Sequence, residues 1–272
     1  MMKNKKLGIY IHIPFCARKC NYCDFLSAPE TRETKERYLS LLDREMQLYK
    51  EIVSAREADT LFIGGGTPSF LETDLTDKLL CSVKKWIPSE NLKEFTIECN
   101  PNSVTEEKLN LYKEAGVTRI SLGMQSACDE ELKKLGRLHS VKEFEKTYEL
   151  VRKHGFERVN IDVMAAIPGQ TIESYKHTLE YVVGLSPEHI SSYSLIIEEG
   201  TPFYEKYREN PPVDEDTDRQ MYDLTKEILG RHGYHRYEIS NYAKEGQECI
   251  HNLKYWQGGD YLGLGLGAAS CM

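Results

Sequence analysis

Short apolar runs and longer amphipathic segments alternate along most of the sequence, and this alternation limits the fold more than any other feature. Apolar runs rich in Ile, Val, Phe and Thr predict six strands, at residues 7–13, 60–63, 94–98, 117–122, 158–163 and 189–196. Amphipathic patterns predict helices between them, at residues 35–54, 74–86, 105–115, 141–154 and 172–183. Repeated strand–helix–strand units form parallel sheets covered by helices. The sequence therefore predicts an α/β fold, either an open doubly wound sheet or a partial barrel.

Glycine, proline and polar residues follow every predicted strand. In sheets of this kind the carboxyl ends of the strands meet at one edge, where binding sites form. Any one of these loops could equally be an ordinary turn, so the prediction of a pocket depends on the whole set. The pocket would be lined by the cysteine loop 16–23, the glycine loop 64–69 and the segments 98–101, 123–126, 162–171 and 191–202.

Cys16, Cys20 and Cys23 lie on one short loop after the first predicted strand, at spacings of four and three residues. Three thiolates on such a loop can hold three irons of a 4Fe-4S cluster. No fourth cysteine follows nearby, so one iron would stay open to bind another ligand. A zinc site completed by His12 is the alternative. Zinc sites usually pair their cysteines two by two, which disfavours that alternative.

The composition is that of an ordinary globular protein, with 40% hydrophobic and 29% charged residues in a chain of 272. The net charge of −8 argues against a nucleic-acid partner. The N-terminal residues do not form a signal peptide, and no stretch reaches the length of a transmembrane helix. We therefore expect a cytoplasmic protein with reduced thiols. The cysteines outside the loop are expected to be buried small residues, at Cys81, Cys99, Cys128, Cys249 and Cys271.

The pattern changes after residue 208. A polar stretch with two prolines, a predicted helix and an aromatic strand candidate follow in turn, at residues 209–216, 217–231 and 234–243. The glycine-rich run 261–272 is not part of a strand–loop–helix unit, so it predicts close backbone packing beside a ligand or strand. We expect one unit at residues 1–208 and the beginning of a smaller domain at 209–272. We expect that domain to be truncated, because the chain stops within structured-looking sequence.

The cysteine loop, which ends in Tyr22, Cys23, Asp24 and Phe25, resembles that of the radical S-adenosylmethionine (radical SAM) enzymes. The glycine loop matches the same superfamily. A narrower resemblance, to the group of oxygen-independent coproporphyrinogen III oxidase and its haem-chaperone relatives, depends on the motifs at 10–16, 98–101, 123–126, 160–162 and 237–241. It covers essentially the whole chain. It implies a partial (β/α)6 barrel, TIM-like and of the radical SAM type, followed by the start of a smaller C-terminal domain.

The resemblance also implies roles for individual residues. It makes Cys16, Cys20 and Cys23 the ligands of a 4Fe-4S cluster. It places S-adenosylmethionine on the open iron, beside Tyr10, Tyr22, Gly65, Gly66, Thr67, Glu98, Gln125, Arg137 and Asp162. The residue types fit, because Glu98 can bind the ammonium group of the methionine moiety and Arg137 its carboxylate. Asp162 can hold the ribose hydroxyls. For Arg137 the alternative is a surface residue on a helix.

Two departures favour the haem-chaperone branch of this group over the oxidases. The oxidases carry a further cysteine two residues after the third, where this chain has Phe25, and an extension before the first strand, where this chain has only residues 1–6. The motif at 251–256 resembles the haem-binding motif of the chaperones. A histidine beside aromatic residues suits haem, because it supplies an axial imidazole and rings that cover the porphyrin. The alternative for His251 is a histidine packed between domains.

The resemblance thus implies a chaperone that binds haem near His251 and delivers it to acceptor proteins, with a 4Fe-4S cluster and S-adenosylmethionine. A reduced cluster of this kind can cleave S-adenosylmethionine to methionine and a 5′-deoxyadenosyl radical. The implied partners are haem-acceptor proteins, including membrane-associated ones, an electron donor such as flavodoxin or ferredoxin, and a second copy in a homodimer. The alternatives are an oxygen-independent coproporphyrinogen III oxidase, which would decarboxylate coproporphyrinogen III, and a zinc-binding structural protein.

Overall fold

One curved sheet organises the structure, a computed structural model that describes residues 6–88 and 90–272. The strands of this part of the chain are β1 (Leu7–Ile13), β2 (Ala58–Gly65), β3 (Glu94–Cys99), β4 (Arg119–Gln125), β5 (Arg158–Ala165), β6 (His189–Ser194), β7 (His235–Arg236), β8 (Asn241–Ala243) and β9 (Tyr261–Leu264). Their order in the sheet is β7-β8-β6-β5-β4-β3-β2-β1-β9. Strands β1 to β6 run parallel, and β9 joins them in parallel beside β1. Strands β8 and β7 extend the other side of the sheet in antiparallel pairing.

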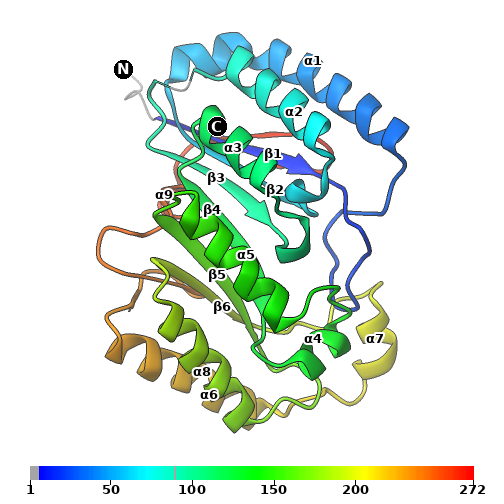
Figure 1. Cartoon of the computed structure of the whole chain (residues 1–272), viewed down its shortest axis with the longest axis vertical. Helices are drawn as coiled ribbons and strands as arrows, with labels where there is room; N and C mark the ends of the chain where they lie inside the picture. The colour runs from blue at the N-terminus through cyan, green and yellow to red at the C-terminus, as the bar shows by residue number, and fades with distance from the viewer. Residues whose placement is uncertain (1–5, 89) are drawn as a thin grey trace.

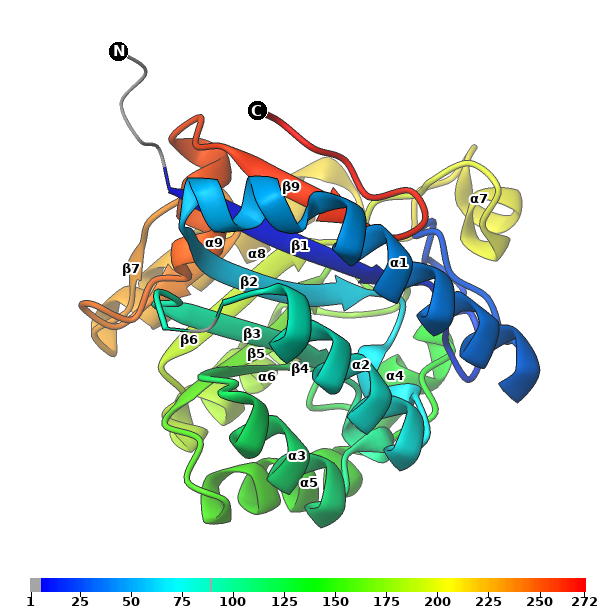
Figure 2. The same ribbon diagram turned by 90° about the horizontal axis from the view of Figure 1, so that it is seen from above.

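Helices connect the parallel strands and lie along the outer face of the sheet, as Figures 1 and 2 show. The helices of the described residues are α1 (Arg32–Arg56), α2 (Thr73–Trp86), α3 (Glu106–Ala115), α4 (Asp129–Leu135), α5 (Val141–Lys153), α6 (Ile172–Leu185), α7 (Pro202–Tyr207), α8 (Glu215–Arg231) and α9 (Ile250–Trp256). Figure 2 looks along the curve of the sheet, with β9 beside β1 at one edge. No hydrogen bonds close the sheet into a complete barrel within the described residues. The structure therefore confirms the α/β fold and has the form of a partial barrel.

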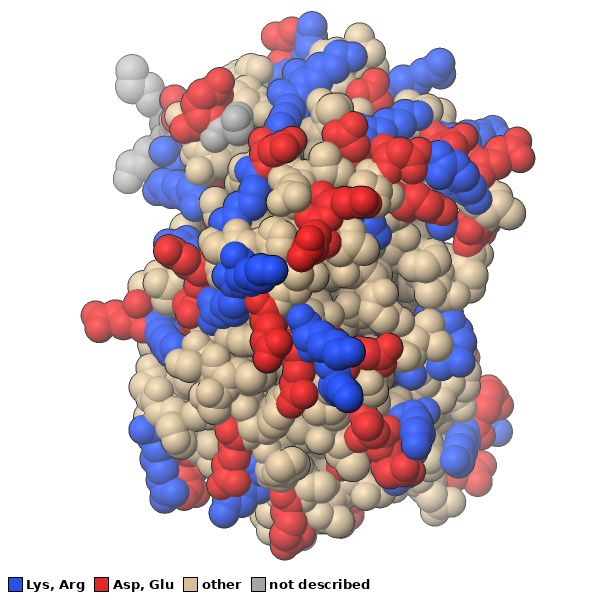
Figure 3. Space-filling view, in the orientation of Figure 1, with Lys and Arg blue, Asp and Glu red and all other residues tan. Residues whose placement is uncertain are grey.

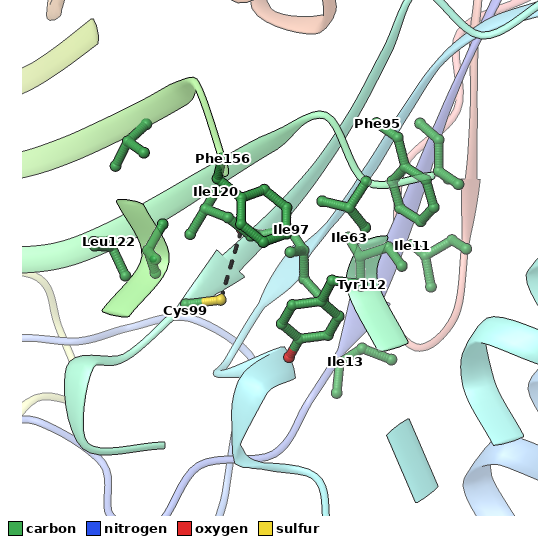
Figure 4. Packing of buried hydrophobic residues seen from close by; sticks show 14 of the residues in the cluster. Ile11, Ile13, Ile63, Phe95, Ile97, Cys99, Tyr112, Ile120, Leu122 and Phe156 are labelled. Atoms are coloured by element: carbon green, nitrogen blue, oxygen red, sulfur yellow. Dashed lines mark hydrogen bonds between the residues drawn. The ribbon is translucent and has the colours of Figure 1, made fainter. Parts of the chain in front are cut away.

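Side chains alternate between two faces along each parallel strand, because successive residues of a strand point to opposite sides. The outer face of β1 is apolar, with Ile9, Ile11 and Ile13 fully buried. Figure 4 shows how Ile11, Ile13 and their neighbours on β2 and β3 pack together beneath Tyr112 of α3. The inner face carries the polar residues of the same strands. This division leaves polar side chains inside the curve of the sheet, where they need hydrogen-bond partners.

Several elements differ from the expectations. The segment 234–243 is not one strand but two short ones, β7 and β8, because the chain turns back where Tyr237 N–H donates to the Asn241 carbonyl. The glycine-rich run does pack beside a strand, since β9 pairs with β1 and a Cβ on Gly263 would lie 2.2 Å from the Ala269 carbonyl oxygen. The expectation of buried cysteines is wrong for Cys81 and Cys271, which are exposed. The division at residue 208 stays a prediction.

The surface carries mixed charge. On the face shown in Figure 3, Lys and Arg side chains are interspersed with Asp and Glu side chains. Among the described helices, none combines the length and the apolar composition that a bilayer crossing would require.

A buried ion pair fixes the amino-terminal end of the inner face. Arg119 of β4 and Glu94 of β3 are 1% and 0% exposed at their side chains, with Arg119 Nε 3.2 Å from Glu94 Oε2. The Glu94 carboxylate also accepts from the backbone N–H groups of Ile250 and His251, at the start of α9. Arg119 donates in turn to the Gln247 and Glu248 carbonyls. The pair therefore attaches the segment 247–251 to the inside of the sheet.

We expect Glu94→Ala to destabilise the fold by about 3–5 kcal/mol, because it leaves the buried Arg119 charge without its partner. The measurement is the free energy of unfolding from urea denaturation. Glu114→Ala, at an exposed position on α3, is the matched control and should change stability by less than about 0.5 kcal/mol. Equal stability of the two variants would contradict this role for the ion pair.

Candidate functional site

A cavity of about 390 Å³ opens at the carboxyl edge of the parallel strands. It gathers most of the residues that the sequence predicted for the site, from segments that are far apart in the chain. These are Cys16, Cys20, Tyr22, Cys23, Gly65, Gly66, Thr67, Glu98, Gln125, Arg137 and Asp162. Tyr10 and His251 are not among its lining residues. The parallel topology thus brings the predicted cofactor residues together at the edge where they were expected.

Hydrogen bonds close the cysteine loop at its base. Cys16 N–H donates to the Ala28 carbonyl and Ala28 N–H to the Pro14 carbonyl, both at 3.1 Å. His12 Nε2 lies 2.8 Å from the Leu26 carbonyl oxygen, and its Nδ1 lies 3.0 Å from the Tyr10 hydroxyl oxygen. His12 therefore supports the loop from below. Its ring nitrogens are both engaged, so it is not poised as the fourth ligand that the zinc alternative needs.

The far side of the cysteine loop docks on the C-terminal end of α4. Asn21 donates twice, from its side-chain amide to the Lys134 carbonyl at 2.9 Å and from its backbone N–H to the Leu135 carbonyl at 3.0 Å. Arg18 donates to the Gly136 carbonyl at 2.6 Å. The last carbonyls of a helix have no partners within the helix and carry partial negative charge. The loop thus satisfies the end of α4, and α4 holds the loop in place.

Sequence reasoning missed α4 and the residues that anchor it. Its signal was present, because three acidic residues at its start, two lysines in its last turn and a following glycine are typical of a short helix. Glu131 fixes this helix from a buried position. Its carboxylate accepts from the Ser126 hydroxyl, the Gln170 amide and the Ser174 hydroxyl, at 2.6, 3.0 and 2.7 Å. Glu131 therefore joins α4 to the loop after β4, to the loop before α6 and to the first turn of α6.

The glycine loop after β2 lies directly against the cysteine loop. Gly66 N–H donates to the Ile13 carbonyl and Thr67 N–H to the Phe15 carbonyl, at 2.9 and 2.8 Å. A Cβ on Gly66 would lie 2.8 Å from the Phe15 carbonyl oxygen, so only glycine permits this approach. Thr67 Oγ1 lies 3.4 Å from Cys16 Sγ. The glycine loop thus sets the position of the first cysteine.

Two carboxyl groups, those of Glu98 and Asp162, line the cavity. Burial, together with the nearby Asp162 charge, raises the pKa of Glu98 to about 8, although the Gly65 N–H donates to this carboxyl. Burial raises the pKa of Asp162 to about 6, against the lowering effect of hydrogen bonds from Asn160 and Ser191 and of the Arg137 charge. At neutral pH the site therefore holds a largely protonated Glu98 and a largely ionised Asp162. A cationic ligand would favour ionisation of both.

Gln125, at the end of β4, and Arg137, just after α4, approach the same space. Arg137 donates to the Gly123 carbonyl at 2.7 Å and lies 3.8 Å from Cys20 Sγ. It is therefore a cavity residue rather than the surface residue of the alternative. Gln125 has a φ of 73°, a conformation that costs energy for a residue with a side chain and that is often found at functional sites. Its Oε1 accepts from the Tyr193 hydroxyl at 2.9 Å. Tyr193 belongs to the segment 191–202, which was expected to line the pocket, but the sequence assigned it no individual role.

The residues present fit a cluster and a sulfonium cofactor. All three loop cysteines are free thiols on one wall of the cavity. Two buried polar atoms of cavity residues have no hydrogen-bond partner in the described part of the chain, Asn100 Oδ1 and Arg137 Nε. No three His, Cys, Asp or Glu side chains of the described residues converge as a single ion would require. A cluster needs no such convergence, because each cysteine binds a different iron.

His251 lies elsewhere, on the inner face of the sheet and 1% exposed. Its Nδ1 is 2.9 Å from Thr60 Oγ1 and its Nε2 is 2.8 Å from the Tyr255 hydroxyl oxygen. Burial, with the neighbouring Lys254 charge, lowers its pKa to about 3. In this conformation the ring is packed and has no free nitrogen for iron. Its role as a haem ligand stays a prediction.

Comparison with known proteins matches residues 10–182 to the radical SAM superfamily. The chain is 40% identical to the haem chaperone HemW of Bacillus subtilis over 95% of this chain and 69% of that protein. It is 39% identical to the haem chaperone HemW of Escherichia coli over 98% of this chain and 71% of that protein. The solved structure of the coproporphyrinogen III oxidase HemN from Escherichia coli superposes with a TM-score of 0.85 at 22% identity. That match covers 98% of this chain and 65% of the oxidase, and it shows a shared fold.

The raised pKa of Glu98 predicts a pH dependence of stability in protein prepared without cofactors. Because the folded-state pKa of about 8 exceeds the ordinary 4.5, the folded state holds a proton that the unfolded state has lost. The free energy of unfolding should therefore fall as pH rises from about 4.5 to 8, with Asp162 adding a fall of the same sign below about 6.

Glu98→Gln should remove part of this fall, measured by urea denaturation across that range. Glu114→Gln, at an exposed position, should retain the wild-type dependence. If Glu98→Gln follows the wild-type curve at every pH, the burial of Glu98 has no such effect.

Proposed function

The chain belongs to the radical SAM superfamily and, within it, to the haem chaperone HemW family, and on that premise we propose that it binds haem and delivers it to acceptor proteins. We propose that it does so with a 4Fe-4S cluster and S-adenosylmethionine as cofactors. One observation carries the cofactor part of the proposal: three free thiols of one loop face a cavity that also holds Glu98, Arg137 and Asp162. The zinc alternative explains the thiols but not these charged groups.

In this proposal Cys16, Cys20 and Cys23 hold the cluster, and the rest of the cavity binds S-adenosylmethionine. When bound, the reduced cluster supplies the electron that can cleave S-adenosylmethionine to methionine and a 5′-deoxyadenosyl radical. Glu98 would give up its proton and pair with the ammonium group of the methionine moiety. Arg137 would bind the carboxylate of that moiety by its free Nε–H and another guanidinium N–H.

The remaining residues orient the adenosine and restrict water. Asp162 is ionised at neutral pH and can accept hydrogen bonds from ribose hydroxyls. Gly65 and Gly66 bring backbone close to the cofactor without side chains in the way. Tyr193 fixes the Gln125 side chain beside them. Tyr10 is not among the residues that line the cavity, and its hydroxyl is bonded to His12, so its proposed role is support of the cysteine loop.

The rim of the cavity supports docking of a protein partner. Phe25, Leu138 and Ile196 line the opening and are 61%, 47% and 67% exposed. We assign this rim to an electron donor such as flavodoxin or ferredoxin, because the electron must reach the adjacent cysteine loop. A homodimer, membrane-associated haem acceptors and a cytoplasmic location remain part of the proposal.

Haem binding is assigned to α9. Tyr255 and Trp256 are 40% and 57% exposed there, so their rings are accessible to a porphyrin. His251 must leave its contacts with Thr60 and Tyr255 before it can bind iron. Haem binding through His251 therefore requires a local opening between α9 and β2, and its apparent affinity is reduced by the cost of that opening.

The cofactor proposal is tested by anaerobic reconstitution with iron and sulfide. We expect wild type to gain the absorption of an iron–sulfur cluster and about four irons per chain. Cys20→Ser should lose the cluster absorption and the bound iron, whereas Cys81→Ser, at an exposed position on α2, should retain both. A wild-type chain that takes up one zinc and no sulfide would overturn the proposal.

The chaperone proposal is tested with the same reconstituted protein. Haem-loaded protein should transfer its haem to a haem-free acceptor, seen as a change of the Soret band. Under reducing conditions with S-adenosylmethionine it should leave coproporphyrinogen III unchanged. Formation of protoporphyrinogen would show an oxidase instead.

The opening of α9 predicts an unusual effect of a variant outside the haem motif. Thr60→Val removes the hydrogen bond to His251 Nδ1 and keeps the side-chain volume. Because that bond holds the ring in the closed state with a net free energy of about 1 kcal/mol, the variant should bind haem about fivefold more tightly in a Soret titration. His251→Ala should lose the shift of the Soret band that accompanies haem binding. His177→Ala, at an exposed position on α6, should keep it. Unchanged affinity in Thr60→Val would mean that haem binds without His251.

A further inference from the structure

A chain of buried hydrogen bonds runs along the inner face of the sheet and ends at the cofactor cavity. Tyr237 hydroxyl oxygen lies 2.7 Å from His189 Nε2, and His189 Nδ1 lies 2.6 Å from Asn160 Oδ1. Asn160 Nδ2 lies 2.7 Å from Asp162 Oδ1. Asn160 and His189 are 5% and 2% exposed.

The direction of every bond in this chain follows from its last member. An ionised Asp162 can only accept, so Asn160 must turn its NH2 group toward it. The Asn160 carbonyl oxygen then faces His189, whose Nδ1 must carry the proton. Burial, with the nearby Arg119 charge, lowers the pKa of His189 well below its ordinary value, so the ring is neutral and its Nε2 accepts from the Tyr237 hydroxyl. All three bonds therefore point toward Asp162.

Side bonds reinforce the same orientation of Asn160. Its Nδ2 also donates to Ser121 Oγ at 2.8 Å, and the Ser191 hydroxyl donates to its Oδ1 at 3.1 Å. A hydrogen-bond chain polarised in one direction strengthens each of its bonds. If His189 were replaced by an apolar residue, the Asn160 oxygen would lose the shorter of its two donors and keep only the Ser191 hydroxyl at 3.1 Å. Rotation of the amide, which would turn an oxygen toward the Asp162 carboxylate, would then cost less than in the wild type.

The other end of the chain lies beside α9. Tyr237 is in the turn between β7 and β8, and the backbone N–H of Cys249, immediately before α9, donates to its hydroxyl oxygen at 3.4 Å. Tyr237 also borders a second cavity of about 340 Å³, together with Trp256 of α9. These hydrogen bonds thus connect α9, the helix assigned to haem binding, with Asp162, the carboxylate assigned to S-adenosylmethionine.

We propose that His189 and Asn160 are positioning residues that act through Asp162, orienting its carboxylate for the cofactor. The proposal deepens the proposed function, because it rests on the assignment of this cavity to S-adenosylmethionine. Tyr237 is the first member of the same chain of hydrogen bonds, and it links the orientation of Asp162 to the position of α9.

The test is a double-mutant cycle on cofactor binding, because a positioning residue has no effect once the group it positions is gone. S-adenosylmethionine is titrated into cluster-reconstituted protein by calorimetry. We expect His189→Leu to weaken binding about five- to tenfold, which is within the range of coupled neighbouring residues. In an Asp162→Ala background the same change should have no effect. A purely structural His189 would weaken binding by the same factor in both backgrounds, and that result would overturn the proposal.

Further variants separate positioning from a general loss of fold. His189→Gln offers one donor and one acceptor and should recover most of the wild-type affinity. Tyr237→Phe removes only a hydroxyl and should weaken binding about two- to threefold, again only while Asp162 is present. His177→Leu, at an exposed position on α6, should match wild type. If His189→Leu and Tyr237→Phe both bind S-adenosylmethionine with wild-type affinity, the positioning role is wrong but the cofactor assignment stands. If the cluster-loaded wild type does not bind S-adenosylmethionine, the cofactor assignment is wrong and the positioning role falls with it.

Discussion

The alternation of side chains along parallel strands is the constraint on which the rest of this structure depends. One face of the sheet is apolar and is covered by helices (Figures 2 and 4). The other face, inside the curve, carries polar side chains. The same parallel direction brings every strand end to one edge. Loops from distant parts of the chain therefore lie around one cavity because of strand direction alone.

The cysteine loop shows how such a cavity is made rigid. It carries the three cysteines that we propose as cluster ligands, and two neighbours set its position: the glycine loop on one side and the end of α4 on the other. Each contact satisfies backbone groups that would otherwise be orphaned. A cluster bound by three cysteines keeps one iron for the cofactor only if the loop cannot fold over and supply another ligand. The paired contacts with α4 and the glycine loop hold it open.

The polar interior has a cost, because buried charges and amides must all be paired. The Glu94–Arg119 pair meets this cost at one end of the sheet and the chain from Tyr237 to Asp162 meets it along the middle. Both attach the start of α9, or the residue just before it, to the sheet. His251 is part of the same interior. This explains why both ring nitrogens of a histidine in a motif that resembles a haem-binding motif are engaged in hydrogen bonds. Movement of α9 is thus linked physically to the groups around the cofactor cavity.

Much of the fold followed from local pattern. The six parallel strands and the helices between them were predicted within a few residues, because period and composition are properties of each segment alone. The two-stranded turn at 234–243 and helix α4 were not, since the first depends on pairing with β6 and the second is held by Glu131 and the cysteine loop. The site residues were predicted from motifs and strand ends. The individual contacts of Asn21 and Tyr193 were not predicted, although both lie in predicted segments, and Glu131 lies outside every predicted segment.

The sequence by itself determined the α/β order, the three thiols on one loop and the edge where the polar loops would meet, because these depend on spacing and strand direction. Only the tertiary structure decided that Arg137 lies in the cavity, that His251 is closed, and that His189 is directed through Asn160 toward Asp162. The physical reason is that hydrogen-bond partners of buried groups come from other strands and helices. Their identity depends on sheet order and register, which no local stretch of sequence contains.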